Sequence, residues 1–315
     1  MSGSEVEAAP GDEFRDRRKK LAAALGPVGL WSFAFDLLTA SKSREILAEI
    51  EELGFPVLWI PEGARSKEVL SHAGLLLSLT SRLVVATGIA NLWARDPPAM
   101  AGGAKLLTEA YPGRFVLGIG VSHSIAVERR GRRYRHPVAA MGRYLDGMER
   151  ARYGGPEPPR PPSIVLAALG PRMLALAAER ALGAHTYFVP VIHTARARAA
   201  LGEHGVLAVE QAVVAETDPQ RARAFGREYT RPYLRLDNYR NSLLRLGFAQ
   251  EELEAGGSDR LVDAIVAWGE PETIRARIHA HHRAGADHVA VQVLPRGAPD
   301  NPMEDLRPLA PALLG

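Results

Sequence analysis

Eight short runs of aliphatic and β-branched residues are spaced along this chain, with a helix-length segment between most of them. The runs are almost continuously apolar, which is typical of strands buried on both faces of a parallel sheet. Parallel strands need crossover helices between them, and eight repeats favour closure into a barrel over an open, doubly wound sheet. The predicted strands are 28–33, 57–60, 83–89, 115–119, 164–168, 185–189, 206–214 and 288–293.

Prolines mark the predicted starts of the helices. The first turn of a helix has no use for the amide hydrogen that proline lacks, so proline is favoured there. Five such prolines stand between predicted strands, at Pro97, Pro137, Pro171, Pro219 and Pro271. A (β/α)8 barrel typically takes about 250 residues and tolerates insertions, so the 315 residues accommodate one. We therefore predict an α/β protein with a (β/α)8 TIM barrel.

Two segments exceed the bare repeat. Residues 12–25 predict an extra amphipathic helix, and residues 215–270 provide more helix than one crossover needs. Insertions of this kind tend to lie over the mouth of a barrel. The expected organisation is an N-terminal tail and helix over 1–25, then one barrel domain over 26–315 that contains a Pro-rich connector at 154–162.

The composition restricts the reactions and partners that are possible for this chain. The chain has no cysteine, which excludes disulfides, thiolate nucleophiles and iron–sulfur clusters, so redox chemistry would need an organic cofactor. The net charge is only +3, and a single short basic run gives little support for a nucleic-acid partner. No apolar run approaches the roughly 18 residues of a membrane span. Residues 1–11 lack the apolar core of a secretory signal, and we expect a cytoplasmic protein without membrane contact.

The loops that follow the carboxyl ends of barrel strands normally build the active site. Four of them read ATGIANLWARDP at 86–97, GIGVSHS at 118–124, ALGPR at 168–172 and YFVPVIHT at 187–194. As a set, these segments resemble the coenzyme-F420-dependent oxidoreductases of the luciferase-like monooxygenase superfamily, over residues 26–295. The resemblance implies a deazaflavin ring at the barrel mouth, hydride transfer with a small organic substrate, and a homodimer.

The resemblance also implies where the cofactor lies. The end of the third strand would support the back of the ring, often through a non-prolyl cis peptide, although an ordinary turn at Gly88 is the alternative. Gly170 and Pro171 open a helix whose free amides favour phosphate, although the pair could simply start a helix. The predicted cofactor residues are Gly88, Ile89, Ala90, Asn91, Ser122, Gly170, Pro171, Arg172, Tyr187, His193 and Thr194.

Two residues are candidates for acid–base catalysis. His123 falls where similar enzymes place a proton-handling group, and imidazole titrates near neutral pH. The alternative is a solvated loop histidine. Glu62 follows the second strand, where deazaflavin enzymes commonly carry an acid followed by histidine. Here Gly63 follows instead, so Glu62 is either an acid–base group or an exposed, solvated carboxylate.

Aromatic and basic residues complete the predicted site. Trp31, Phe33, Phe35 and Trp93 are candidates for the substrate pocket, with an ordinary core position as the alternative for each. The arginine-rich run 129–135 could hold the phosphate and oligoglutamate tail of the coenzyme, or it could be solvated.

Metal and nucleophile chemistry find little support. His279, His281 and His282 lie on one predicted helix, but only His279 and His282 share a face, and no carboxylate or third ligand follows at a catalytic spacing. We therefore interpret them as solvated histidines near the C-terminus of the helix. No metal site is predicted. The motifs of serine hydrolases and P-loop proteins are absent from the sequence.

Two other functions remain open. The same fold could be an FMN-dependent monooxygenase that receives reduced flavin and reacts with dioxygen. A function of another class is a catalytically silent barrel that acts as a binding or scaffold protein, which the altered motif at Glu62 favours.

Overall fold

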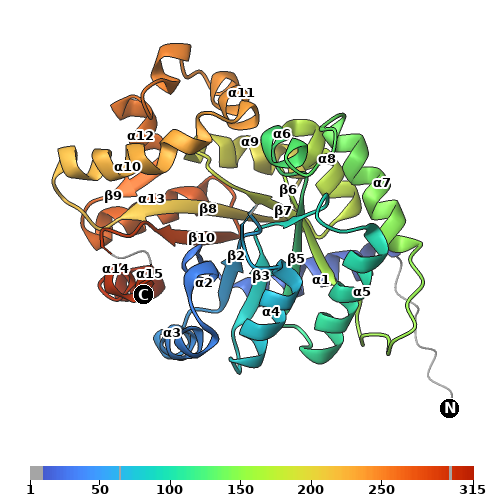
Figure 1. Cartoon of the computed structure of the whole chain (residues 1–315). Helices are drawn as coiled ribbons and strands as arrows, with labels where there is room; N and C mark the ends of the chain where they lie inside the picture. The colour runs from blue at the N-terminus through green and yellow to red at the C-terminus, as the bar shows by residue number, and fades with distance from the viewer. Residues whose placement is uncertain (1–9, 64, 298–299) are drawn as a thin grey trace.

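Eight parallel strands close into a barrel in the computed structural model, which describes residues 10–63, 65–297 and 300–315 (Figure 1). Strand β10 pairs with both β1 and β8, and these two pairings close the sheet. The predicted fold is confirmed. The barrel strands are β1 (Val28–Trp31), β2 (Val57–Ile60), β3 (Val84–Thr87), β5 (Phe115–Gly120), β6 (Ser163–Ala167), β7 (Gly183–Thr186), β8 (Val206–Val214) and β10 (His288–Val293).

All five prolines stand at the first turn of a helix, as predicted. Asp96 and Asp218, which precede two of them, each accept a hydrogen bond from a backbone amide of the first turn. These five helices are α5 (Pro97–Ala110), α7 (Pro137–Glu149), α8 (Pro171–Arg180), α10 (Pro219–Tyr233) and α13 (Pro271–Arg283). The others outside the insertion are α1 (Pro10–Leu25), α2 (Ala34–Leu37), α3 (Ala40–Leu53), α4 (Val69–Ser78), α6 (Ser124–Glu128), α9 (Val191–Leu201), α14 (Pro302–Leu306) and α15 (Ala310–Leu314).

Helix α1 is the predicted extra helix, and it packs against the amino ends of the strands. Its Leu21 and Leu25 share a buried cluster with the first inward residues of several strands, among them Val57, Val84 and Val206. Burial of these side chains supplies the hydrophobic free energy that closes this end of the barrel. The acidic start of the chain, residues 1–9, lies outside the described residues.

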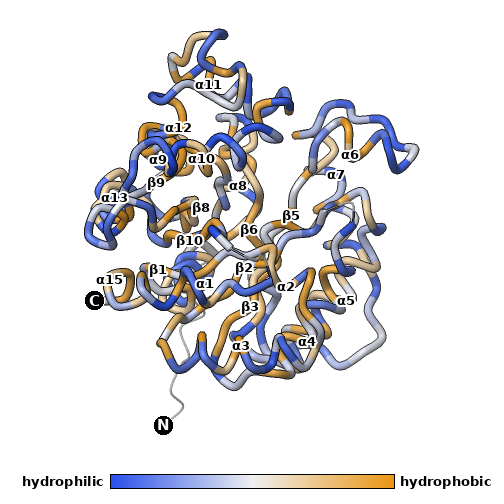
Figure 2. The backbone as a smooth tube through the Cα atoms, turned by 60° about the vertical axis from the view of Figure 1, so that its left-hand side comes forward, coloured by the Kyte–Doolittle hydropathy of each residue, from blue (hydrophilic) through white to orange (hydrophobic). Residues whose placement is uncertain are grey.

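The predicted insertion lies between β8 and β10. It contains α10, α11 (Asp237–Arg245), the 3-10 helix η1 (Gln250–Leu253), α12 (Asp259–Ile265) and strand β9 (Val266–Trp268), which pairs with the second half of β8. Its apolar side chains form a cluster of their own with Phe188 and Leu294 of the barrel. Figure 2 shows α11 and α6 projecting from the same end of the molecule.

Three predicted strands end two or three residues earlier than expected, and the first strand, β1, stops at Trp31. The third stops at Thr87, a cis peptide bond joins Gly88 to Ile89, and the short strand β4 (Ala90–Asn91) then pairs with β5. The sixth stops at Thr186, because Phe188 has a φ of 58°, which is outside the range of a strand. Tyr187 and Phe188 therefore belong to the loop at the barrel mouth. In the described part of the chain no helix is both long and apolar enough to cross a membrane.

Candidate active site

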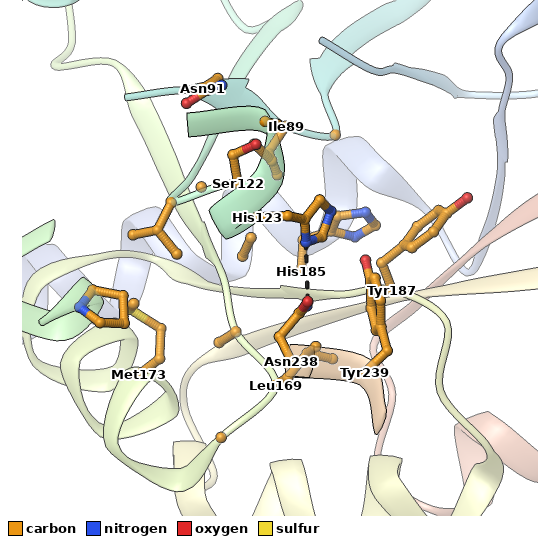
Figure 3. Close-up of a pocket in the computed structure, with 18 of the residues that line it drawn as sticks. Ile89, Asn91, Ser122, His123, Leu169, Met173, His185, Tyr187, Asn238 and Tyr239 are labelled. Atoms are coloured by element: carbon orange, nitrogen blue, oxygen red, sulfur yellow. Dashed lines mark hydrogen bonds between the residues drawn. The ribbon is translucent and has the colours of Figure 1, made fainter. Parts of the chain in front are cut away.

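A cavity of about 670 Å³ opens at the carboxyl ends of the strands. Its wall is mainly apolar, and it is built by the loops after β1, β2, β3, β5, β6 and β7 together with the insertion (Figure 3). The structure therefore brings most of the predicted site residues together. Those that line the cavity are Trp31, Phe33, Glu62, Gly88, Ile89, Asn91, Ser122, His123, Gly170, Pro171, Arg172 and Tyr187.

The wall around Gly88 combines close packing with unused hydrogen-bonding groups. A Cβ atom on Gly88 would lie 2.6 Å from Nε1 of Trp31 and 3.4 Å from Nε2 of His185, so only glycine fits without a shift. Nε1 of Trp31 and both ring nitrogens of His185 are buried and lack a hydrogen-bond partner among the described residues. Such groups are costly unless something pairs with them, which favours a polar ligand atom nearby.

His185 was missed by the sequence analysis, which treated it as an ordinary strand residue. Burial and, to a smaller extent, the nearby His288 lower the pKa of His185 to about 3, so the imidazole is neutral. Its ring stacks on Trp59 with 4.4 Å between the ring centroids. The signal available in the sequence was its position two residues before Tyr187, because alternate residues of a strand face the same side.

His123 is half-buried at the cavity and is not a solvated loop histidine. Its Nδ1 lies 3.1 Å from Oδ1 of Asn238 in α11, as the dashed line in Figure 3 shows. Burial lowers the pKa of His123, while the hydrogen bond with Asn238 acts in the opposite direction. The imidazole is therefore mainly neutral at pH 7 and can accept a proton.

Glu62 does not match the solvated carboxylate of the sequence analysis. Its side chain is only 5% exposed and forms an ion pair with Arg95. Oε2 accepts one hydrogen bond of 3.0 Å from Nη1 of Arg95 and another of 2.7 Å from the backbone amide of Asn91. These bonds hold the β4 loop against the cavity, so the structure makes Glu62 a positioning residue. The prediction of a catalytic acid or base at Glu62 is not supported by this geometry.

Three arginines line the cavity. Arg172 lies at the start of α8, Arg130 comes from the loop after α6, and Arg245 ends α11. Gly170 and Pro171 also line the cavity, so the amino end of α8, the positive end of its dipole, lies at the cavity wall. This combination attracts anions. Of the arginine-rich run, Arg130 and Tyr134 reach the cavity wall.

Five predicted site residues lie away from the cavity. Nε2 of His193 pairs with the carbonyl of Leu169 at 2.9 Å, and Oγ1 of Thr194 pairs with Nδ1 of His281 at 2.8 Å. The predicted second phosphate edge is therefore wrong, because α9 begins at Val191 and turns both side chains into the protein.

The other three are Phe35, Trp93 and Ala90. Phe35 is 1% exposed in the core, and Ala90 is fully buried in β4. The indole Nε1 of Trp93 donates to the carbonyl of Val121 at 3.0 Å, which fixes it against the β5 loop. Phe35 and Trp93 therefore have the ordinary core positions that the sequence analysis gave as the alternative to a place in the substrate pocket.

The interpretation of the α13 histidines as solvated is also corrected. His281 is fully buried between Thr194 and Oε1 of Gln211, which lies 2.9 Å from its Nε2, and only His279 is exposed. Among the residues that the structure describes, no group of three or more His, Cys, Asp or Glu side chains could hold a metal ion.

The insertion supplies the cavity residues that sequence reasoning could not find. Tyr233, Asn238, Tyr239 and Arg245 form one wall. Their placement depends on how α10 and α11 pack over the barrel, and no local pattern in the sequence encodes that packing.

The fold and the site together define a (β/α)8-barrel protein with its ligand cavity at the carboxyl ends of the strands, the location used by barrel enzymes. The chain belongs to the luciferase-like monooxygenase family, whose model matches residues 37–288.

Relatives illustrate the range of this family. A 5,10-methylenetetrahydromethanopterin reductase from Archaeoglobus fulgidus is 29% identical over 146 residues, which cover 41% of this chain and 44% of that protein. The chain thus spans less than half the length of this curated relative.

Two solved structures share the fold over nearly their whole length. An F420-dependent secondary alcohol dehydrogenase, solved with an F420-acetone adduct, has a TM-score of 0.73 and 14% identity, covering 92% of this chain and 99% of that one. The FMN-bound oxygenating component of 3,6-diketocamphane monooxygenase from Pseudomonas putida has a TM-score of 0.68 and 16% identity, covering 92% and 97%.

Proposed function

We propose that this protein is an oxidoreductase that transfers hydride between coenzyme F420 and a small organic substrate. The observation that carries the proposal is the composition of the cavity: buried, unpartnered hydrogen-bonding groups at Trp31 and His185, and a cationic edge at the start of α8. A planar ring that carries polar atoms and an anionic tail needs both features.

The residues present fit such a cofactor. The cavity volume of about 670 Å³ lies within the range of about 300–1,000 Å³ that ligand sites usually occupy. The wall from Gly88 to Asn91 would support the ring. The amides at the start of α8 would hold the phosphate, and Arg130, Arg172 and Arg245 would hold the charged tail.

When bound, the deazaflavin supplies a carbon that donates or accepts hydride in place of the flavin nitrogen N5. The protein's own contribution is orientation, exclusion of water and proton handling. Asn238 holds the ring of His123 at the cavity, where the neutral imidazole can take up a proton. The apolar wall keeps water away from the reacting atoms.

The expected cytoplasmic location and the homodimer remain part of the proposal. A nucleic-acid partner and a membrane are not proposed.

The test is a titration of the purified protein with oxidised and reduced F420 and, separately, with FMN. Absorbance, cofactor fluorescence and oxygen consumption are followed together. We expect F420 to bind at micromolar concentration and FMN not to bind. Binding of reduced FMN with oxygen consumption would identify a flavin monooxygenase instead, and binding of neither cofactor would favour a scaffold protein.

A further inference from the structure

A buried carboxyl group lies beside the cavity without a cationic partner. Glu210 of β8 is 1% exposed. Its Oε2 accepts a hydrogen bond of 3.0 Å from the amide of Phe188, and its Oε1 lies 3.2 Å from the hydroxyl of Tyr229. Within the described residues Glu210 makes no ion pair. An uncompensated charge in such a place is costly, so the group favours its neutral form.

The groups that surround Glu210 are tyrosines. Tyr187 approaches from the loop after β7, Tyr229 and Tyr233 from α10, and Tyr239 from α11. Burial raises the pKa of Glu210 to about 8, and the hydrogen bonds from Phe188 and Tyr229 oppose this rise. At neutral pH the carboxyl therefore carries a proton that it can release under mildly basic conditions.

Tyrosine hydroxyls connect this carboxyl to the cavity. The hydroxyl of Tyr233 lies 2.7 Å from that of Tyr187, which in turn donates to Oε1 of Gln292 at 2.9 Å. The ring of Tyr229, whose hydroxyl lies next to Glu210, packs beside the ring of Tyr233 with 5.1 Å between the centroids. Tyr187 and Tyr233 line the cavity, so this tyrosine cluster extends from the cavity wall to Glu210.

We propose that Glu210 is the proton reservoir of this site and exchanges a proton with the cavity through the hydroxyls of Tyr229, Tyr187 and Tyr233. The proposal rests on the proposed hydride transfer. It adds a residue that touches neither the cofactor nor His123.

The step balances in both directions. When hydride from the reduced coenzyme forms a C–H bond on the substrate, the π bond at that carbon breaks and its electron pair moves to the neighbouring heteroatom. That atom takes a proton from the nearest tyrosine hydroxyl, each hydroxyl is reprotonated by the next, and Glu210 becomes a carboxylate. Oxidation of the substrate runs the same path in reverse and returns the proton to Glu210.

The first test does not depend on activity. Infrared spectra of the wild type should show a protonated carboxyl band at pH 7 that disappears near pH 9.5, and Glu210→Gln should lack this band at both pH values. Glutamine keeps an acceptor for the amide of Phe188 but cannot titrate. A spectrum without the band at pH 7 would overturn the proposal.

The second test measures single-turnover hydride transfer from reduced F420 to a substrate against pH. In the wild type the rate should fall above about pH 8, because the reservoir is then empty. Glu210→Gln should be slower by about 100-fold, the usual size of an acid–base contribution, and should lose this limb of the profile. Tyr229→Phe breaks the same path and keeps the test valid if Glu210→Gln does not fold.

Glu216→Gln is the matched control. Its side chain is 10% exposed, but its carboxylate pairs with Arg221 outside the cavity, so the pH profile should be unchanged. If the wild-type protein does not bind F420, both the proposed function and the proton reservoir are overturned. Binding of F420 with the same pH profile in the wild type, Glu210→Gln and Tyr229→Phe overturns the reservoir alone.

Discussion

The imidazole of His123 and the side-chain amide of Asn238 meet at 3.1 Å, although 115 positions separate them in the chain. His123 follows β5, whereas Asn238 belongs to α11 of the insertion. This contact ties the insertion to an imidazole at the cavity that can accept a proton.

Replacing Asn238 with Asp should raise the pKa of His123. A carboxylate next to an imidazole stabilises its protonated form, typically by a shift of about one unit or more. The present pKa lies below the ordinary value of 6.5 because of burial. The acid limb of hydride transfer should move to higher pH in parallel. Histidine NMR titrations measure the shift, with His123→Asn assigning the signal among the ten histidines. An unchanged titration would show that the contact does not form in solution.

Glu62→Gln should lower the free energy of unfolding by about 2 kcal/mol. The substitution removes the buried carboxylate partner of Arg95 and leaves Arg95 paired only with the more exposed Glu68. Urea unfolding measures the loss. Glu45→Gln is the control, because Glu45 pairs with Lys42 at the surface, where ion pairs contribute little. Equal stability of the two variants would contradict this account of the β4 loop.

Gly88→Ala should weaken cofactor binding and destabilise the fold by about 1–3 kcal/mol, since the new methyl group overlaps Nε1 of Trp31. F420 titration and urea unfolding measure the two effects. On α7, a methyl group at Gly142 meets open space, so Gly142→Ala should stabilise by up to about 1 kcal/mol and leave binding unchanged. If Gly88→Ala binds F420 with the affinity of the wild type, Trp31 and Gly88 do not belong to the cofactor site.

Acid should destabilise this protein through its buried histidines. Burial lowers the pKa of His185 to about 3 and that of His288 to about 4, so the unfolded chain binds more protons than the folded one below about pH 6.5. The stability that the two neutral histidines contribute is therefore fully present above that pH and declines as the pH falls. Between pH 7 and pH 5 each such histidine lowers the free energy of unfolding by about 2 kcal/mol.

His185→Phe isolates one of these contributions. Phenylalanine retains a ring against Trp59 and cannot titrate. The loss of unfolding free energy between pH 7 and pH 5, measured with urea, should be about 2 kcal/mol smaller than in the wild type. An identical loss in both proteins would mean that His185 titrates normally in the folded state.

Arg172→Ala should weaken F420 binding by about tenfold, because a charge-assisted hydrogen bond to an anion is lost. The affinity of the variant should also depend less on salt. Fluorescence titrations at two salt concentrations measure both effects. Arg44→Ala, an exposed arginine on α3, is the control. If both variants bind like the wild type, the amino end of α8 is not the anion site.

The barrel could be predicted because its signals are local. Apolar runs identified the strands, and prolines identified helix starts to the residue. The break at Gly88 could not be predicted from strand periodicity, because the apolar run continues across it. The early end of the sixth barrel strand, β7, goes with the positive φ of Phe188, a backbone conformation that an apolar run does not reveal.

The candidate site was predicted where the chemistry lies on strand-end loops and missed where it depends on distant partners. Nothing near Glu62 in the sequence announces Arg95, which lies 33 positions away. The sequence at the start of α9 did not reveal that His193 and Thr194 point inward. Glu210 was hidden in an apolar strand whose tyrosine partners belong to the insertion.

One wall of the cavity comes from a single continuous stretch that has its own apolar cluster. Such a stretch behaves as an exchangeable module: its sequence can diverge, or be grafted from a related barrel, while the cradle around Gly88 and the start of α8 stays intact. Differences in ligand preference among proteins of this architecture can therefore accumulate in one segment.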